Sequence, residues 1–182
     1  MNYQTVICDL TGMELSNASL LDEGTSAAEA MTMLFANRDR EKVNNNCNKF
    51  FVADDVFDQT LDVLMTRAEP LGIEIVKNSI DKINVDKSFF GSYVQYTGKN
   101  GQINDLKTIS KTISNYDIKL IVAADLLSLT ILEKPSLFNC DVVVGTSQRF
   151  GIPLGYGGPH AGYFATKKQY KRSIPGRIIG VS

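Results

Sequence analysis

An apolar run at residues 141–144 (DVVV), followed by a polar turn and a glycine-rich loop, constrains the fold more than any other feature. The run is typical of a buried strand. The polar turn and the glycines lie in TSQRFGIPLGYGGPH, residues 146–160. In α/β proteins, ligand chemistry gathers where a strand ends in such a loop. We therefore expect an α/β fold with a candidate site at the carboxyl end of this strand.

The rest of the chain alternates between short apolar runs and segments with helical periodicity. Strands are predicted at residues 49–52, 73–76, 92–96, 119–124, 141–145 and 161–165. Helices are predicted at residues 3–11, 26–35, 56–68 and 105–116, with a short basic helix at 167–172 and a polar loop at 16–19. Strands that alternate with helices indicate βαβ units and a mostly parallel sheet. No repeat or linker interrupts the pattern, so we expect one domain, which looks like a piece of a longer protein.

Length and charge exclude several functional classes. With 182 residues and 43% hydrophobic content, the chain is long enough to bury a core. Its 19 basic and 20 acidic residues give a net charge of −1, so no basic field is available for nucleic acid. No apolar run approaches the roughly 18 residues of a membrane span, and residues 1–5 do not resemble a signal peptide. We expect neither a nucleic-acid nor a membrane partner.

The cysteines and the histidine offer little chemistry of their own. Cys8, Cys47 and Cys140 are odd in number and widely spaced, which predicts reduced thiols that pack as small hydrophobic groups. His160 is the only histidine, so a histidine-centred triad or a multi-histidine metal site has no second member. We expect no metal. His160 is interpreted as a hydrogen-bonded structural group, and a role at a surface facing another domain stays open as the alternative.

Three stretches of the chain resemble the glycine cleavage system P-protein family: residues 17–31 (NASLLDEGTSAAEAM), 143–160 (VVGTSQRFGIPLGYGGPH) and 174–182 (IPGRIIGVS). The similarity runs nearly the whole length and is weakest at residues 40–105. It implies a fold-type-I pyridoxal-phosphate (PLP) transferase major domain, a three-layer α/β/α sandwich that is incomplete here. Family members have two homologous halves, fused or separate. Residues 1–182 resemble part of the N-terminal half.

The same resemblance implies that this half lacks the Schiff-base lysine. In the family the C-terminal half carries that lysine in a His-Lys-Thr-Phe stretch followed by Ile-Pro. Matching Phe150 and residues 152–153 to this stretch puts Ser147 at the histidine, Gln148 at the lysine and Arg149 at the threonine. A side-chain amide is not a nucleophile, so Gln148 cannot form the cofactor linkage. We expect no catalytic residue in this segment and PLP bound by the other half.

Asp125 ends the predicted central strand and admits two interpretations. In active enzymes of this fold, an aspartate at a strand end pairs with the cofactor's pyridinium nitrogen. Alternatively, the carboxylate caps residues 126–127 and is inherited from a duplicated ancestor. The missing lysine favours the capping interpretation.

The segment Gly24–Thr25–Ser26 begins a predicted helix and could cradle a phosphate with its backbone amides. Asp22 and Glu23 place negative charge directly before it, which disfavours an anion. We therefore interpret Thr25 or Ser26 as the helix N-cap only. The residues of the candidate pseudo-site, none of them expected to bind a cofactor, are Asp125, Gly24, Thr25, Gln148 and His160.

The remaining charged and glycine residues near the loop are assigned to surfaces. The glycines of residues 155–158 permit tight turns and close approach to a neighbouring domain. Arg149 and Arg177 could pair with carboxylates across a domain boundary, although a surface or intrachain ion pair is the simpler prediction. Lys167 and Lys168 begin the short basic helix and are expected to face solvent.

The resemblance implies two hypotheses about function. In the first, the chain is part of an enzyme that decarboxylates glycine through PLP and transfers the aminomethyl group to the lipoyl arm of the H-protein. The segment would then scaffold the lysine-bearing half within a homodimer or heterotetramer, located in the cytoplasm or, in a eukaryote, in mitochondria. In the second, it is a non-catalytic structural or regulatory subunit that pairs with a separate catalytic subunit.

Overall fold

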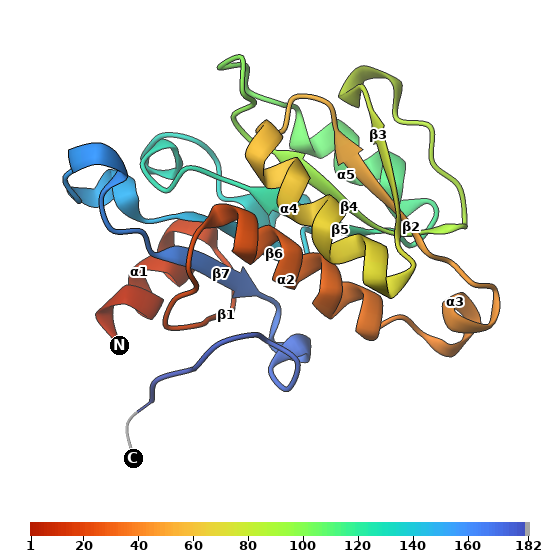
Figure 1. The fold of residues 1–182 in the computed structure, drawn as a ribbon, viewed down its shortest axis with the longest axis horizontal. Helices are drawn as coiled ribbons and strands as arrows, with labels where there is room; N and C mark the ends of the chain where they lie inside the picture. Colours follow the sequence, from red (N-terminus) through yellow and green to blue (C-terminus); the bar gives the residue numbers. More distant parts are fainter. Residues whose placement is uncertain (181–182) are drawn as a thin grey trace.

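A seven-stranded sheet, in the order β1-β7-β6-β5-β4-β2-β3, forms the centre of the molecule. The computed structural model describes residues 1–180 (Figure 1). The strands are β1 Leu15–Ser16, β2 Lys49–Ala53, β3 Glu74–Asn78, β4 Phe89–Gln95, β5 Lys119–Ala123, β6 Val142–Thr146 and β7 Gly162–Thr166. Strands β2 to β6 are paired in parallel, whereas β7 is antiparallel to both β6 and β1. The expected mostly parallel α/β fold is confirmed.

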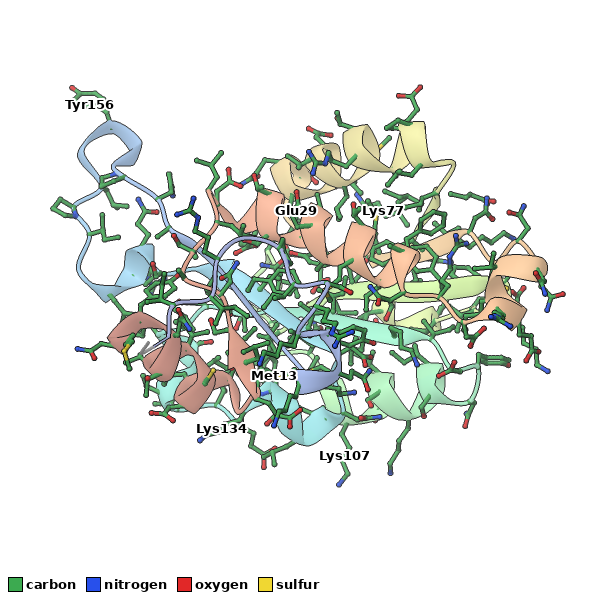
Figure 2. All side chains as sticks on the ribbon, turned by 90° about the horizontal axis from the view of Figure 1, so that it is seen from below. Met13, Glu29, Lys77, Lys107, Lys134 and Tyr156 are labelled. Carbon is green, nitrogen blue, oxygen red and sulfur yellow. The ribbon has the colours of Figure 1, made fainter. Side chains whose placement is uncertain are left out.

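Helices cover both faces of the sheet and complete three layers. The helices are α1 Asn2–Thr11, α2 Glu23–Ala36, α3 Arg40–Asn44, α4 Asp58–Ala68 and α5 Leu106–Ser114. Figure 2 shows Glu29 of α2 on one side of the sheet and Lys107 of α5 on the other. Both faces are covered, which explains why β5 (KLIVA) and β6 (VVVGT) are almost continuously apolar and buried.

Helix α2 lies across the middle of the sheet and contacts β4, β5, β6 and β7. Its buried face is rich in alanine and ends in larger side chains; the buried members include Ala27, Ala28, Ala30, Met31 and Leu34. Alanine is a strong helix former, and its small side chain allows the helix axis to approach the strands closely. This packing fixes the amino end of α2 near the carboxyl ends of the central strands.

The structure differs from the sequence-based elements at several places. Residues 15–16 form the short edge strand β1, whereas the sequence predicts a polar loop from Ser16 onward. Helix α3 was not predicted at all. The basic helix expected at residues 167–172 is only a 3₁₀ turn, Lys168–Tyr170. These elements are short, and two to five residues carry too little periodicity to reveal them.

Asp141 connects three strands on the edge opposite the glycine loop. Its Oδ2 accepts a hydrogen bond from the amide of Leu120 at 3.0 Å, and its Oδ1 lies 2.9 Å from Lys167 Nζ. Its backbone carbonyl accepts the Thr166 hydroxyl at 2.8 Å. Lys167 was expected to face solvent, and that expectation is wrong, because its side chain is only 29% exposed and pairs with a buried carboxylate. Lys168 is exposed.

Candidate functional site at the carboxyl edge of the sheet

The carboxyl ends of β4, β5 and β6 meet the amino end of α2 at one edge of the sheet. Gln95, the last residue of β4, donates from Nε2 to Glu23 Oε1 of α2 at 3.2 Å. Tyr163 of β7 lies opposite Gly145 and donates its hydroxyl to Ala124 O, just after β5, at 2.6 Å. A side chain at Gly145 would collide with this arrangement, because its Cβ would lie 2.4 Å from Ala124 O.

The amino end of α2 is capped by Asp22, not by Thr25 or Ser26 as the sequence suggested. Asp22 Oδ1 accepts the Thr25 amide at 2.7 Å, and the Ser26 hydroxyl donates to Asp22 O at 2.7 Å. Aspartate is a preferred N-cap because its carboxylate also interacts favourably with the helix dipole. The prediction took the first hydroxyl residues of the run as the cap and missed that the helix begins earlier. Gly24 and Thr25 therefore stand beside a carboxylate that already uses a first-turn amide.

Asp125 follows β5 and is engaged by protein groups. Its Oδ1 accepts the Leu127 amide at 3.0 Å, and its Oδ2 lies 3.3 Å from Arg149 Nη1. The Asp125 side chain is 29% exposed and that of Arg149 is 61% exposed. This ion pair links the end of β5 to the loop after β6. Arg177, the other arginine considered from sequence, is exposed, and its carbonyl accepts the Ala18 amide at 2.6 Å.

Gln148, at the lysine position of the family motif, binds the glycine loop. Its Nε2 donates to Gly157 O at 2.7 Å. The loop turns sharply: Tyr156 has φ 57°, and a Cβ at Gly158 would lie 2.2 Å from Pro153 O. Tyr156 is at the exposed tip of this loop (Figure 2). Gln148 thus acts as a tie across the loop that contains it.

His160 ends the same loop and is exposed to solvent. It does not join Asp125 or Gln148 in any hydrogen bond within residues 1–180. The structure therefore brings Asp125 and Arg149 together, and leaves His160 on the outer surface of the loop. A role for His160 toward a neighbouring domain stays a prediction.

Glu23 is the residue of this edge that sequence analysis undervalued. Burial raises the pKa of its carboxyl group, the hydrogen bond from Gln95 lowers it, and the carboxylates of Asp125 and Asp22 raise it further. Behind it, Tyr93 and Gln95 are 0% and 4% exposed, and neither Tyr93 Oη nor Gln95 Oε1 has a hydrogen-bond partner. Polar residues inside a buried strand were the available signal. The sequence marks Glu23 only as a negative charge at a helix start, because its contact with Gln95 exists only in the folded chain.

The residues at this edge do not fit PLP. Gln148, which the family resemblance matches to the Schiff-base lysine, has a side-chain amide that is bonded to the loop. The helix end that would receive the phosphate presents Asp22 as its cap and Glu23 half-buried beside it. An anion at this end would meet two carboxylates, which is unfavourable in a partly desolvated site. The edge is built for contacts among protein groups and not for this cofactor.

Other candidate groups lie away from this edge. Cys47 and Cys140 are buried and Cys8 is half-buried, and all three are free thiols. Within residues 1–180, no cluster of three His, Cys, Asp or Glu side chains has a metal-binding arrangement. Over the same residues, no helix combines the length and apolar character needed to span a lipid bilayer.

Comparison with known proteins gives the family. The family model for "Glycine cleavage system P-protein" matches residues 1–182. The chain is similar to "Glycine dehydrogenase (decarboxylating)" of Flavobacterium johnsoniae, with 54% identity over 182 residues. The match covers all of this chain and 19% of the relative, so the chain spans about a fifth of that relative's length.

Comparison with solved structures supports the same family and fold. A crystal structure of glycine decarboxylase (P-protein) in inhibitor-bound form superposes with a TM-score of 0.89 at 30% identity, covering 99% of this chain and 41% of that one. A putative O-acetylhomoserine (thiol)-lyase from Campylobacter jejuni, solved with a pyridoxyl-lysine, has a TM-score of 0.68 at 14% identity, covering 96% and 42%. The latter similarity supports the fold alone, which is that of the fold-type-I PLP-dependent enzymes. The chain belongs to the glycine cleavage system P-protein family.

Proposed function

We propose that residues 1–182 form part of the N-terminal, lysine-lacking half of a glycine-decarboxylating P-protein. The whole protein would remove CO₂ from glycine with PLP held elsewhere in the protein and pass the aminomethyl group to the lipoyl arm of the H-protein. Family membership supports this proposal, as does the relative described as glycine dehydrogenase (decarboxylating). Because this chain covers 19% of that relative, the activity is assigned to the longer protein.

The observation that carries the proposal is the bond from Gln148 Nε2 to Gly157 O at 2.7 Å. The residue at the cofactor-lysine position is used to hold a loop, which supports a scaffolding role for this half. The capping of α2 by Asp22 supports the same role, because it fills the helix end where a phosphate would otherwise bind.

The exposed side of the edge is proposed to pack against the lysine-bearing half. Leu154 is 69% exposed and Tyr156 is fully exposed at the loop tip, with Arg149 and His160 nearby in sequence and also exposed. Exposed large apolar groups of this kind mark contact surfaces. The matched relative is a single, much longer polypeptide, which favours fused halves, and a homodimer of such chains is the expected assembly over a heterotetramer.

The test uses the full-length protein purified with PLP. Borohydride reduction followed by peptide mapping should give one stoichiometric pyridoxyl-lysine outside residues 1–182. In parallel, ¹⁴C-carboxyl-labelled glycine should release labelled CO₂ only in the presence of lipoylated H-protein. A stoichiometric pyridoxyl group on any lysine of residues 1–182 would contradict the lysine-lacking assignment. Absence of CO₂ release would contradict the proposed enzyme.

A further inference from the structure

The carboxyl edge of the sheet carries more negative than positive charge. Three carboxylates, those of Asp22, Glu23 and Asp125, lie at this edge, and the charges of Asp22 and Asp125 raise the pKa of the Glu23 carboxyl group. The only ion pair they make within residues 1–180 is that of Asp125 with Arg149. Asp22 is bonded to a backbone amide. Glu23 is left with a single neutral donor, the side-chain amide of Gln95.

The environment of Glu23 is costly for a carboxylate. A partly desolvated carboxylate is stable when an opposite charge or several hydrogen bonds offset the loss of water. Glu23 has one hydrogen bond, and its nearest charged neighbours repel it. Glu23 as a whole residue is half-buried and not fully enclosed.

Two buried oxygens beside Glu23 also lack partners. Gln95 Oε1 belongs to the same amide that bonds Glu23, and Tyr93 Oη lies on the same strand, two residues earlier. Both side chains are at least 96% buried. Buried polar atoms in native proteins are nearly always hydrogen-bonded, so unpartnered ones call for an explanation. Gln95 Oε1 and the Glu23 carboxylate are acceptors that lack a further donor, whereas the Tyr93 hydroxyl can donate as well as accept. No positive charge among the described residues pairs with Glu23.

We propose that Glu23 receives a basic side chain, arginine or lysine, from a part of the protein outside residues 1–182. The inference rests on the proposed function, since it needs the longer protein to pack against this edge. A guanidinium suits the site best, because its fork of five donors can pair with Glu23 and extend to the neighbouring amide oxygen. The resulting ion pair, called the Glu23 socket below, would join this edge of the sheet to the rest of the protein.

The test compares two isosteric variants of one helix in the full-length holoenzyme. Glu23→Gln removes the charge and leaves the incoming cation unpaired, so the melting temperature should fall and hydrogen exchange at the start of α2 should rise. Glu29→Gln is the matched control, because Glu29 lies on the same helix and pairs with Arg67 at the surface. The control should change little, as expected for an exposed ion pair. Glu23→Gln melting at or above the wild-type temperature overturns the proposal.

The pH dependence of stability distinguishes an ionised Glu23 paired with a cation from a Glu23 carboxyl group that stays protonated. A lone carboxyl whose pKa is raised above its ordinary value of 4.5 loses stability as pH rises above that value, so wild type would weaken against Glu23→Gln from about pH 4.5 upward. With a cation in place, the carboxylate stays ionised, and wild type keeps its advantage across that range. A wild-type advantage that shrinks or reverses with rising pH overturns the proposal.

Two further measurements complete the test. Adding glycine should leave the difference between the variants unchanged, and a difference that depends on glycine would mean that a small amine occupies the site instead. A structure of the full-length protein should place a Lys or Arg nitrogen within about 4 Å of the Glu23 carboxylate. Wild-type glycine turnover, measured separately, reports on the proposed enzyme and not on the Glu23 socket.

Discussion

Replacing Asp141 by alanine should loosen the centre of the sheet, because its carboxylate joins β5 to the segment after β7. The carboxylate is 8% exposed, accepts the Leu120 amide at 3.0 Å and lies 2.9 Å from Lys167 Nζ. The Tyr170 hydroxyl is a third, longer contact at 3.4 Å. Alanine removes all three acceptor interactions at once.

The cost follows from what each partner loses. The Leu120 amide is left buried without an acceptor, which costs about 1–3 kcal/mol. The Asp141–Lys167 pair ranks between an exposed pair worth under about 1 kcal/mol and a buried one whose disruption costs about 3–5 kcal/mol. Lys167 is 29% exposed and can recover water, which favours the lower part of that range. We expect a total of about 2–5 kcal/mol, or a loss of amide protection of roughly 30- to 5,000-fold.

Hydrogen-exchange mass spectrometry of the full-length protein measures this loss locally, in peptides covering β5 and β6. Lys167→Met should lower protection less, because Asp141 then keeps the Leu120 amide. Asp58→Ala is the control, since its 3.3 Å pair with Lys99 is 76% exposed on the carboxylate side and contributes little. Unchanged protection of β5 and β6 in Asp141→Ala would refute the reasoning, as would an equal loss in the Asp58→Ala control.

Two other predictions concern the core. Gly145→Ala should lower the free energy of unfolding by about 1–3 kcal/mol through overpacking, because its Cβ would lie 2.6 Å from the ring of Tyr163. Thermal melting should measure this loss. Gly155→Ala is the control and should melt near the wild-type temperature, because its Cβ would have no neighbour within 4 Å. Burial raises the pKa of the Cys140 thiol from 9.0 to about 12, so the folded protein favours the neutral thiol and loses stability as pH rises from about 9 toward 12. Iodoacetamide at pH 8 should therefore label Cys8 first and Cys140 only after unfolding, and equal labelling rates in the native protein would contradict this.

The amino-acid sequence alone predicted the fold class and what Gln148 can do chemically. The apolar runs at β5 and β6 are long and continuous enough to require burial on both faces, which predicts a parallel sheet covered by helices. That Gln148 cannot form a Schiff base follows from its side-chain chemistry, because an amide cannot act as an amine in any fold. The family motif of residues 143–160 contains most of β6 and Gln148.

Only the tertiary structure decided which hydrogen bonds the polar groups at the carboxyl edge of the sheet make. Asp22 caps α2 in place of Thr25 or Ser26, because the helix already begins at Glu23 and the Asp22 side chain accepts the Thr25 amide. The contact between Glu23 and Gln95 joins residues 72 positions apart. Hydrophobic periodicity in the sequence indicates which face of a helix or strand is buried, from residues only a few positions apart. Ion pairs and unpartnered oxygens depend instead on the order of the strands and on the residue at which each strand ends. Such contacts exist only once the chain has folded.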